Sequence, residues 1–236
     1  MTTVLALDTC DRTAGVAVAV GGEVRCWRVE HSPLRHSVRL LTLVEESLAA
    51  AGVEREDLDG IAVTRGPGSF TGVRVGVATA KGLAFALGVP VVGVSSLAAL
   101  WRGAAPFPGV VVPVLDARKR QVYATARQGR EGGGILLGEG AWDPEEVLES
   151  LATEREPCLF LGSGLGPYRE TFARALGDRF LAAAEMRWAI HPGDVALAGW
   201  EALQRGDGTP PAALTPTYRR RSEAEEARRS MMAATS

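Results

Sequence analysis

The sequence contains few cysteine and histidine residues, the side chains that most often bind metal ions or act as nucleophiles and bases. Its 236 residues include three cysteines and three histidines, which are Cys10, Cys26, Cys158, His31, His36 and His191. An odd number of cysteines at scattered spacings argues against a disulfide framework and favours a reducing, cytoplasmic compartment. His31 and His36 lie five residues apart across Pro33, and no Cys-x-x-Cys pair is present. We therefore expect no metal site held by this chain alone.

Charge and long apolar segments are also limited. The formal net charge is −2, so no strong overall field would draw the chain to nucleic acid. Apolar runs are interrupted by glycine, proline or charge well before about 20 residues, and the first run ends at Asp8 after an N-terminus without a basic segment. We therefore expect neither a membrane span nor a signal peptide. The chain has no asparagine and 24 arginines against two lysines, which fits heat adaptation or GC-rich coding.

The first half of the sequence alternates between apolar runs and helical patterns. Strands are predicted at 4–7, 14–20, 23–30, 58–63 and 89–94, and helices at 37–51, 72–87 and 95–101. The Gly21-Gly22 pair between the second and third strands is typical of a hairpin turn. This order predicts an α/β lobe with a mixed sheet and with helices after the later strands.

The second half begins in the same way as the first. Residues 110–115 run into Asp116 as residues 4–7 run into Asp8, and a hairpin partner is expected at 121–126. This repeat predicts a duplicated fold with two lobes. After a polar loop at 127–134, helices are predicted at 144–151, 168–176 and 194–205, and a strand at 158–161. We place the N-terminal lobe at 1–105, the C-terminal lobe at 106–208 and a polar tail at 209–236.

A glycine-rich segment, residues 66–72, lies between a predicted strand and a predicted helix. Backbone N–H groups at such a helix start favour an anion, so Gly66 and Gly68 are candidates for a residual nucleotide or anion site. The segment lacks the Lys-Ser/Thr pair of a Walker loop, and Thr71 stands where the dinucleotide fingerprint needs glycine. The alternative interpretation is that the glycines permit a tight turn and close helix packing.

Asp8 and Asp116 each end a predicted strand where a hairpin begins. In a phosphotransferase, such aspartates hold a metal ion or a phosphate-bound water; the alternative is a turn-capping role. Neither hairpin contains a small glycine-rich loop that would make room for a triphosphate. Gly162 and Gly164, between a later strand and helix, are further candidates to lie against an adenosine. We expect no catalytic residue, no cofactor and at most a weak adenine-nucleotide site.

Two predicted helices carry more apolar surface than one sheet can cover. On helix 37–51 the apolar residues spread over about half of the circumference, whereas packing on one sheet needs an arc of only about 100°. On helix 72–87, Gly72, Gly76 and Ala80 recur every four residues and would let another backbone approach closely. The apolar surface that one sheet cannot cover indicates a second contact, either with another chain or between the two helices themselves. A basic cluster at 219–221 is either solvated or contacts RNA or an acidic partner.

Several segments resemble the TsaB (YeaZ) family. The most specific is Gly66-Pro67-Gly68-Ser69-Phe70-Thr71-Gly72 with the four residues that follow it. The other matching segments are 4–9, 14–20, 81–84, 92–97, 115–118, 122–123 and 216–220. The matching segments lie close together in the N-terminal half and are short and scattered in the C-terminal half.

The resemblance implies an actin/Hsp70-like (ASKHA) two-lobed α/β fold with duplicated mixed sheets flanked by helices. It also implies a non-catalytic subunit of the bacterial machinery that makes threonylcarbamoyladenosine at position 37 of tRNA. The partners would be a TsaD-type catalytic subunit and a TsaE-type ATPase, with tRNA bound only through the complex and a homodimer when the chain is alone. The catalytic paralogue carries two metal-binding histidines, and aligning the strands places Ser96 and Leu100 at those positions.

In this family the two apolar helices form the interface with the catalytic subunit. The resemblance therefore implies that this contact uses Leu40, Leu43, Val44, Ser47, Val73, Val77 and Ala80. Arginine at Val77 or Leu43 is then expected to abolish co-purification with the catalytic subunit and to leave the isolated chain cooperatively folded.

Three other functions stay open from the residues alone. An ATP-dependent phosphotransferase of the sugar-kinase type is compatible with the fold and with Asp8 and Asp116. A peptidase is a second alternative, although no Ser/His/Asp or metalloprotease pattern supports it. A stand-alone regulatory homodimer is the third.

Overall fold

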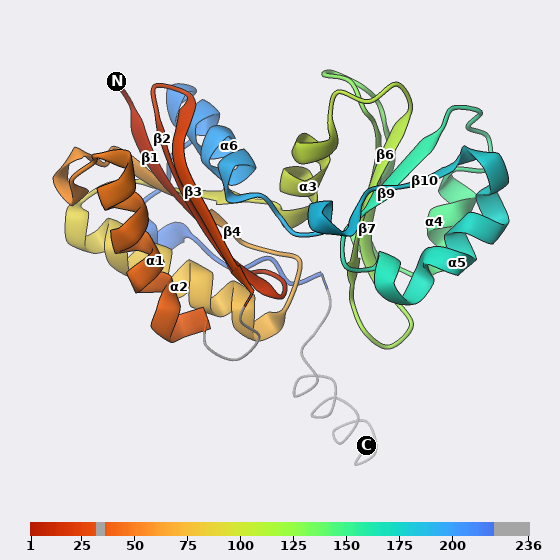
Figure 1. Cartoon of the computed structure of the whole chain (residues 1–236), viewed down its shortest axis with the longest axis horizontal. Helices are drawn as coiled ribbons and strands as arrows, with labels where there is room; N and C mark the ends of the chain where they lie inside the picture. The colour runs from red at the N-terminus through yellow and green to blue at the C-terminus, as the bar shows by residue number, and fades with distance from the viewer. Residues whose placement is uncertain (32–35, 220–236) are drawn as a thin grey trace, which may run out of the picture.

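The computed structural model describes residues 1–31 and 36–219 and consists of two five-stranded sheets flanked by helices (Figure 1). The first sheet has the order β3-β2-β1-β4-β5, in which β1, β4 and β5 are parallel and β2 and β3 are antiparallel. Its strands are β1 (Thr3–Asp8), β2 (Thr13–Val20), β3 (Glu23–His31), β4 (Gly60–Thr64) and β5 (Val91–Val94).

The second sheet repeats this topology strand for strand. Its order is β10-β9-β6-β7-β8, so β6 takes the place of β1, β9 that of β4 and β10 that of β5. The strands are β6 (Val110–Asp116), β7 (Val122–Gln128), β8 (Ile135–Trp142), β9 (Cys158–Leu161) and β10 (Phe180–Ala182). The duplication predicted from the two strand–Asp–hairpin segments is confirmed.

Helices cover both faces of the first sheet. α1 (His36–Ala51) and α2 (Phe70–Leu87) lie on one face, and α6 (Pro192–Gln204) lies on the other (Figure 1). Neighbouring residues of β4 show this directly, because Ala62 approaches Gly199 of α6 whereas Val63 approaches Gly76 of α2. Strands buried on both faces read as continuous apolar runs, which is why they were predicted from the sequence.

The remaining helices lie between the lobes and on the second sheet. α3 (Ser96–Ala104) contacts β6 and α6, and α4 (Pro144–Ser150) and α5 (Leu165–Leu176) cover the second sheet. Short 3-10 turns are formed by Arg55–Asp57, Gly177–Arg179, Glu185–Arg187 and Pro211–Ala213. β8 and β10 were not predicted, because β8 contains two glycines and no clear alternation and β10 has three residues.

The predicted lobe boundary is wrong for α6. This helix was predicted to belong to the C-terminal lobe, but it packs on β1, β2 and β4 of the first sheet, where Val195 and Ala196 are fully buried. The chain thus returns to its first lobe after completing the second. Order along the sequence could not reveal this return, because it depends on which sheet face was left uncovered.

The tail predicted to be polar is also partly structured. Thr209 pairs with Val91 through two backbone hydrogen bonds of 2.9 Å, and Leu214 is 4% exposed. Lys81 donates to the carbonyl of Leu214 at 3.0 Å, and the N–H of Thr217 donates to that of Arg65 at 2.6 Å. Residues 209–219 therefore belong to the first lobe; residues 220–236, including most of the basic cluster, lie outside the described part.

α2 is long and apolar enough to cross a membrane by length and composition alone. Core helices of soluble proteins pass the same test, and one-third of this helix is buried inside the structure. Its inner residues pack on β4, and Ser69 and Gly88 cap its ends. Packing on the first sheet therefore explains the apolar residues on the inner side of α2.

Candidate functional site

The seven residues expected to contact a partner lie inside the chain. None of them is more than 4% exposed, so the expectation that these side chains form an intermolecular contact is wrong. They are Leu40, Leu43, Val44, Ser47, Val73, Val77 and Ala80. α1 packs on β2, β3 and α2, while α2 packs on β4, β1 and the turn at 211–213. The strands of the first sheet make most of the contacts of both helices and α1 touches α2 only slightly, so the sheet, more than the neighbouring helix, covers the predicted residues.

A different set of residues remains uncovered on the side of these helices that faces away from the sheet. Phe85 is 84% exposed, Leu41 is 50% exposed and Phe70 is 39% exposed. We call this the outer α1–α2 face, and it comprises Leu41, Thr42, Glu45, Phe70, Arg74, Ala78, Gly82 and Phe85. The apolar side chains that stay exposed on these helices thus lie on a different side from the predicted residues.

The start of α2 is organised by aromatic and cationic contacts. Phe70 and Tyr218 have ring centroids 5.1 Å apart, and the Arg74 guanidinium lies 4.2 Å from the Phe70 ring. Arg74 also donates to the Tyr218 hydroxyl at 3.0 Å. Tyr218 therefore lies beside the N-terminal end of α2 and forms part of the outer face there. No local sequence signal predicts this contact.

The glycine-rich segment is closed by the chain's own backbone. A Cβ on Gly66, which has φ +102°, would lie 2.6 Å from the carbonyl oxygen of Thr217. A Cβ on Gly68 or Gly72 would collide with the carbonyl oxygen of Cys10 or Thr9. The glycines therefore permit close backbone packing, as the alternative interpretation held, and these contacts give no support to a nucleotide or anion site at Gly66 and Gly68.

Asp8 at the end of β1 is fully buried beside this segment. Its Oδ1 accepts hydrogen bonds from the Thr64 hydroxyl at 2.5 Å and from the Cys10 N–H at 3.2 Å, whereas Oδ2 has no partner among the described residues. Burial raises the pKa of Asp8 from 3.8 to about 6, although both hydrogen bonds lower it. Burial and the nearby Asp8 also raise the pKa of Cys10 to about 12. The carboxyl group does not reach solvent, where a metal–nucleotide complex would bind.

Asp116 in the second lobe is bonded within its own turn. Its Oδ1 accepts the Arg118 N–H at 2.8 Å, and its Oδ2 pairs with the Arg118 guanidinium at 3.2 Å. Gly162 and Gly164 pack against the backbone of Val114, and a Cβ on Gly162 would collide with the Val114 carbonyl oxygen. The predicted site residues thus form two clusters, one in each lobe, and in both clusters the turn-capping and packing interpretations explain the contacts.

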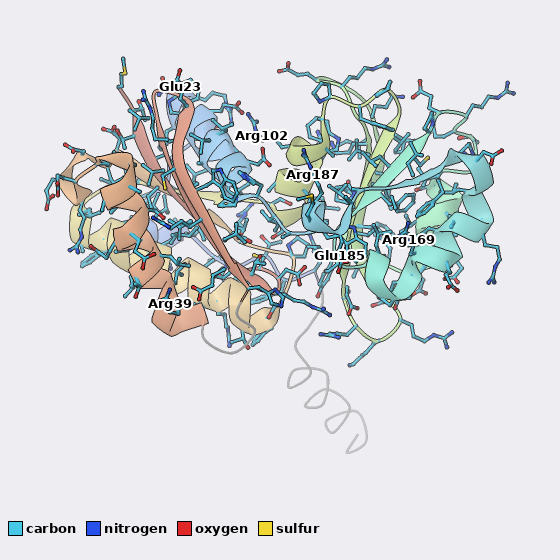
Figure 2. All side chains as sticks on the ribbon, in the orientation of Figure 1. Glu23, Arg39, Arg102, Arg169, Glu185 and Arg187 are labelled. Carbon is cyan, nitrogen blue, oxygen red and sulfur yellow. The ribbon has the colours of Figure 1, made fainter. Side chains whose placement is uncertain are left out.

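Residues that sequence reasoning missed join the two lobes. Glu139 on β8 accepts a hydrogen bond from Ser95, the N-cap of α3, at 2.7 Å and pairs with Arg219 at 3.4 Å. Arg102 and Arg187 lie between the lobes (Figure 2), where Arg187 donates to the carbonyl of Gly103 at 3.2 Å. These partners are 44 to 84 residues apart, so no local pattern indicated them.

No group of three or more His, Cys, Asp or Glu side chains able to hold a metal ion occurs within residues 1–31 and 36–219. At the positions aligned with the metal-binding histidines of the catalytic paralogue, Ser96 and Leu100 are buried in α3.

We predict opposite effects for two glycine-to-alanine changes in α2. Gly72→Ala should destabilise the chain by about 1–3 kcal/mol, because the new methyl group meets the Thr9 backbone. Gly82→Ala should stabilise it by about 0.5–1 kcal/mol, because nothing lies within 4 Å and alanine favours helix. Urea unfolding of both variants tests this, and equal effects would mean that Gly72 is not held against the β1–β2 turn.

Comparisons with known proteins agree on one family. A family model described as "TsaD: tRNA N6-adenosine threonylcarbamoyltransferase" matches residues 30–227. A Bacillus subtilis protein named "tRNA threonylcarbamoyladenosine biosynthesis protein TsaB" is 33% identical over 227 residues, which cover 94% of this chain and 96% of that protein. The chain belongs to the TsaB (YeaZ) family. The Escherichia coli TsaB is 36% identical over 166 residues, covering 68% of this chain and 71% of that protein.

Solved structures confirm the family and the fold. The structure of YeaZ from Pseudomonas aeruginosa has a TM-score of 0.78 and 34% identity, covering 92% of this chain and 100% of that chain. The ethanolamine utilization protein EutJ of Carboxydothermus hydrogenoformans has a TM-score of 0.50 at 15% identity, covering 84% of this chain and 91% of that one; it shows likeness of fold alone. The predicted actin/Hsp70-like fold with two duplicated lobes is confirmed.

Proposed function

We propose that this chain is a non-catalytic subunit of the complex that makes threonylcarbamoyladenosine at position 37 of tRNA. It binds a TsaD-type catalytic subunit through the outer α1–α2 face. The observation that carries the proposal is the exposure of Phe85 (84%) and Leu41 (50%) on helices whose inner faces are fully buried. Large apolar side chains gathered on one exposed face are typical of a protein–protein contact.

The relation between the two families supports this pairing. The TsaD family model matches this chain, and a tRNA N6-adenosine threonylcarbamoyltransferase from Moorella thermoacetica is 35% identical over 132 residues, covering 49% of this chain and 39% of that protein. A related catalytic subunit would present an equivalent pair of helices, so the two chains could pair about a pseudo-twofold axis. The same face would pair two copies of this chain when the catalytic subunit is absent.

The other partners enter through the assembled complex. A TsaE-type ATPase and tRNA bind the complex of the two related subunits, and the complex acts in the cytoplasm. This chain supplies no metal and no resident cofactor. At most weak binding of an adenine nucleotide is proposed, and the closed packing at Gly66, Gly68, Gly162 and Gly164 gives it no support.

Two features support a role without catalysis. Asp8, the aspartate that a phosphotransferase would need, is fully enclosed by Thr64 and Cys10. Asp116 is engaged by Arg118 of its own turn. The proposed contribution is therefore to bind and orient the catalytic subunit.

Co-expression with the TsaD-type subunit of the same organism tests the proposal. We expect the tagged chain to retain the catalytic subunit on an affinity column and the mass in solution to equal that of a stoichiometric complex. Modification of a tRNA transcript should require both subunits together with the ATPase. Full activity of the catalytic subunit and the ATPase without this chain would contradict the proposed role.

Replacing Asp8 tests whether this chain acts only as a binding subunit or also takes part in catalysis. We expect Asp8→Asn to leave the rate of tRNA modification by the complex within about twofold of wild type, because no step uses this carboxyl group. Removing a catalytic carboxylate would instead lower the rate by 10²-fold or more. The measurement is threonylcarbamoyladenosine formed per complex, and a loss of that size despite normal assembly would assign Asp8 a chemical role.

A further inference from the structure

The last described segment of the chain, residues 209–219, is held on the first lobe as far as Thr217. Leu214 is buried there, and the Thr217 N–H donates to the Arg65 carbonyl at 2.6 Å. The Thr217 carbonyl oxygen also lies 2.6 Å from the position that a Cβ on Gly66 would take. The two residues that follow Thr217 therefore start from a fixed point on the first lobe.

Those two residues, Tyr218 and Arg219, contact different parts of the molecule. Tyr218 packs against the Phe70 ring at the start of α2, with ring centroids 5.1 Å apart, and accepts a hydrogen bond from Arg74 at 3.0 Å. It is 44% exposed, so its ring adds to the outer α1–α2 face. Arg219 pairs instead with Glu139 on β8 of the second lobe, at 3.4 Å. One residue thus belongs to the proposed docking surface, and its neighbour is bound to the other lobe.

Glu139 is held from the first lobe through both of its carboxylate oxygens. Oε1 accepts a hydrogen bond from the Ser95 hydroxyl at 2.7 Å, and Oε2 pairs with Arg219. Ser95 is the N-cap of α3, and Arg219 ends the described chain, which lies between the lobes (Figure 1). The side chain of Glu139 is 23% exposed, so solvent screens the ion pair only in part. These contacts favour the angle between the lobes at which Glu139 meets both donors.

The two contacts are linked because Tyr218 and Arg219 are adjacent in the chain. Consecutive Cα atoms lie about 3.8 Å apart across a trans peptide bond, which leaves no slack between them. A change in the angle between the lobes therefore either breaks the Arg219 ion pair or moves Tyr218 against Phe70. A partner bound to Phe70 and Tyr218 holds Tyr218 in place, and so favours the angle at which Arg219 reaches Glu139. By linkage, that angle then favours binding of the partner by the same factor.

We propose that Tyr218 and Arg219 couple binding of the catalytic subunit on the outer α1–α2 face to the angle between the two lobes. This inference rests on the proposed function, which supplies the partner for that face. The partner surface that meets this end of the face is apolar, because Phe70 and Tyr218 offer two exposed rings. Arg219 and Glu139 are positioning residues that act on the contact through Tyr218.

The test is a double-mutant cycle on Arg219 and Glu139, measured as the dissociation constant of the complex with the catalytic subunit. Arg219→Gln and Glu139→Gln each remove the ion pair, and glutamine at position 139 keeps an acceptor for the Ser95 hydroxyl. Glu149→Gln is the matched control, because it removes an exposed carboxylate from α4 on the same lobe as Glu139. The melting temperature of each isolated chain is measured in parallel.

We expect each single variant to weaken binding about two- to fivefold, the effect of losing one partly exposed ion pair. The double variant should bind no more weakly than either single variant, because both changes remove the same contact. Glu149→Gln should leave the affinity unchanged. Melting temperatures of the isolated chains should fall by no more than about 4 °C, which separates a change in coupling from a loss of folding.

Tyr218 is tested separately, because its ring is part of the outer α1–α2 face. Tyr218→Ala should weaken binding about tenfold, since it removes one ring of an aromatic pair from the contact. Tyr218→Phe keeps the ring and loses only the hydrogen bond from Arg74, so binding should weaken by no more than about threefold. Equal affinities of wild type and Tyr218→Ala would exclude Tyr218 from the contact and overturn the coupling.

Other results of the cycle would overturn the coupling in distinguishable ways. Weaker binding by Arg219→Gln with normal binding by Glu139→Gln would mean that Arg219 touches the partner directly and transmits nothing from the second lobe. Additive losses in the double variant would show that the two residues act independently. Normal binding by all three variants would remove the coupling and leave the proposed function standing. Failure of the wild-type chain to bind the catalytic subunit would instead contradict the proposed function itself.

Discussion

Replacing Val77 by arginine should unfold the chain, whereas the same change at Phe85 should leave it folded and unable to retain its catalytic partner. Val77 is 4% exposed on the inner side of α2, which packs on the first sheet, and an unpaired guanidinium there would cost more than about 4 kcal/mol. Phe85 is 84% exposed on the same helix, so arginine there meets only solvent in the isolated chain. In the complex it would place a charge in an apolar contact.

The measurements are cooperative urea unfolding of each isolated chain and recovery of the catalytic subunit from co-expression. Leu43→Arg, also at a buried position, is expected to behave like Val77→Arg. Ile135→Arg is a matched control, because this residue is 63% exposed on β8 of the other lobe. Normal complex formation by Phe85→Arg would show that the outer α1–α2 face is not the docking surface. A stably folded Val77→Arg chain would contradict the packing of α2.

The buried Asp8 should make the stability of the chain fall as the pH rises from about 4 to about 7. Its pKa is 3.8 before folding and about 6 in the folded chain, so the folded state binds the proton more tightly. The resulting contribution is fully present below pH 3.8 and is lost as the pH passes 6, a total of about 3 kcal/mol. The physical reason is that a fully buried carboxylate loses its hydration when it ionises.

Asp8→Asn isolates this effect because asparagine has no proton to lose. The difference in unfolding free energy between wild type and Asp8→Asn should change by about 3 kcal/mol across this pH range, in favour of the variant at neutral pH. Thr64→Val removes a hydrogen bond that favours the ionised form, so the loss should extend to higher pH. If the unfolding free energies of wild type and Asp8→Asn changed with pH in the same way, the pKa of Asp8 would be the same in the folded and the unfolded chain.

Most of the architecture could be predicted from the sequence. Strands buried on both faces give continuous apolar runs, and the two strand–Asp–hairpin segments revealed the duplication before any tertiary contact was known. Gly88 marked the end of α2, whereas the start of this helix was predicted at residue 72, two residues after its observed start at Phe70. β8 was missed because its glycines and half-buried residues give no clear period.

The candidate site could be predicted only in outline. The two helices were identified, but a helical wheel shows how wide an apolar arc is and not which part of it the sheet covers. The sheet and neighbouring elements enclose Leu43 and Val77, while Leu41 and Phe85 stay outside. The glycine positions were also noted correctly, but only the structure shows that carbonyl groups of the same chain approach them.

By itself, the sequence determined the repeated α/β pattern, the scarcity of metal-binding side chains and the resemblance to a single family, because these depend on local spacing and residue type. Tertiary structure alone decided which helix faces are uncovered, that α6 and residues 209–219 complete the first lobe, and that Asp8 is sealed from solvent. These properties depend on contacts between segments far apart in the chain, whose geometry is set only when the sheets and helices pack together.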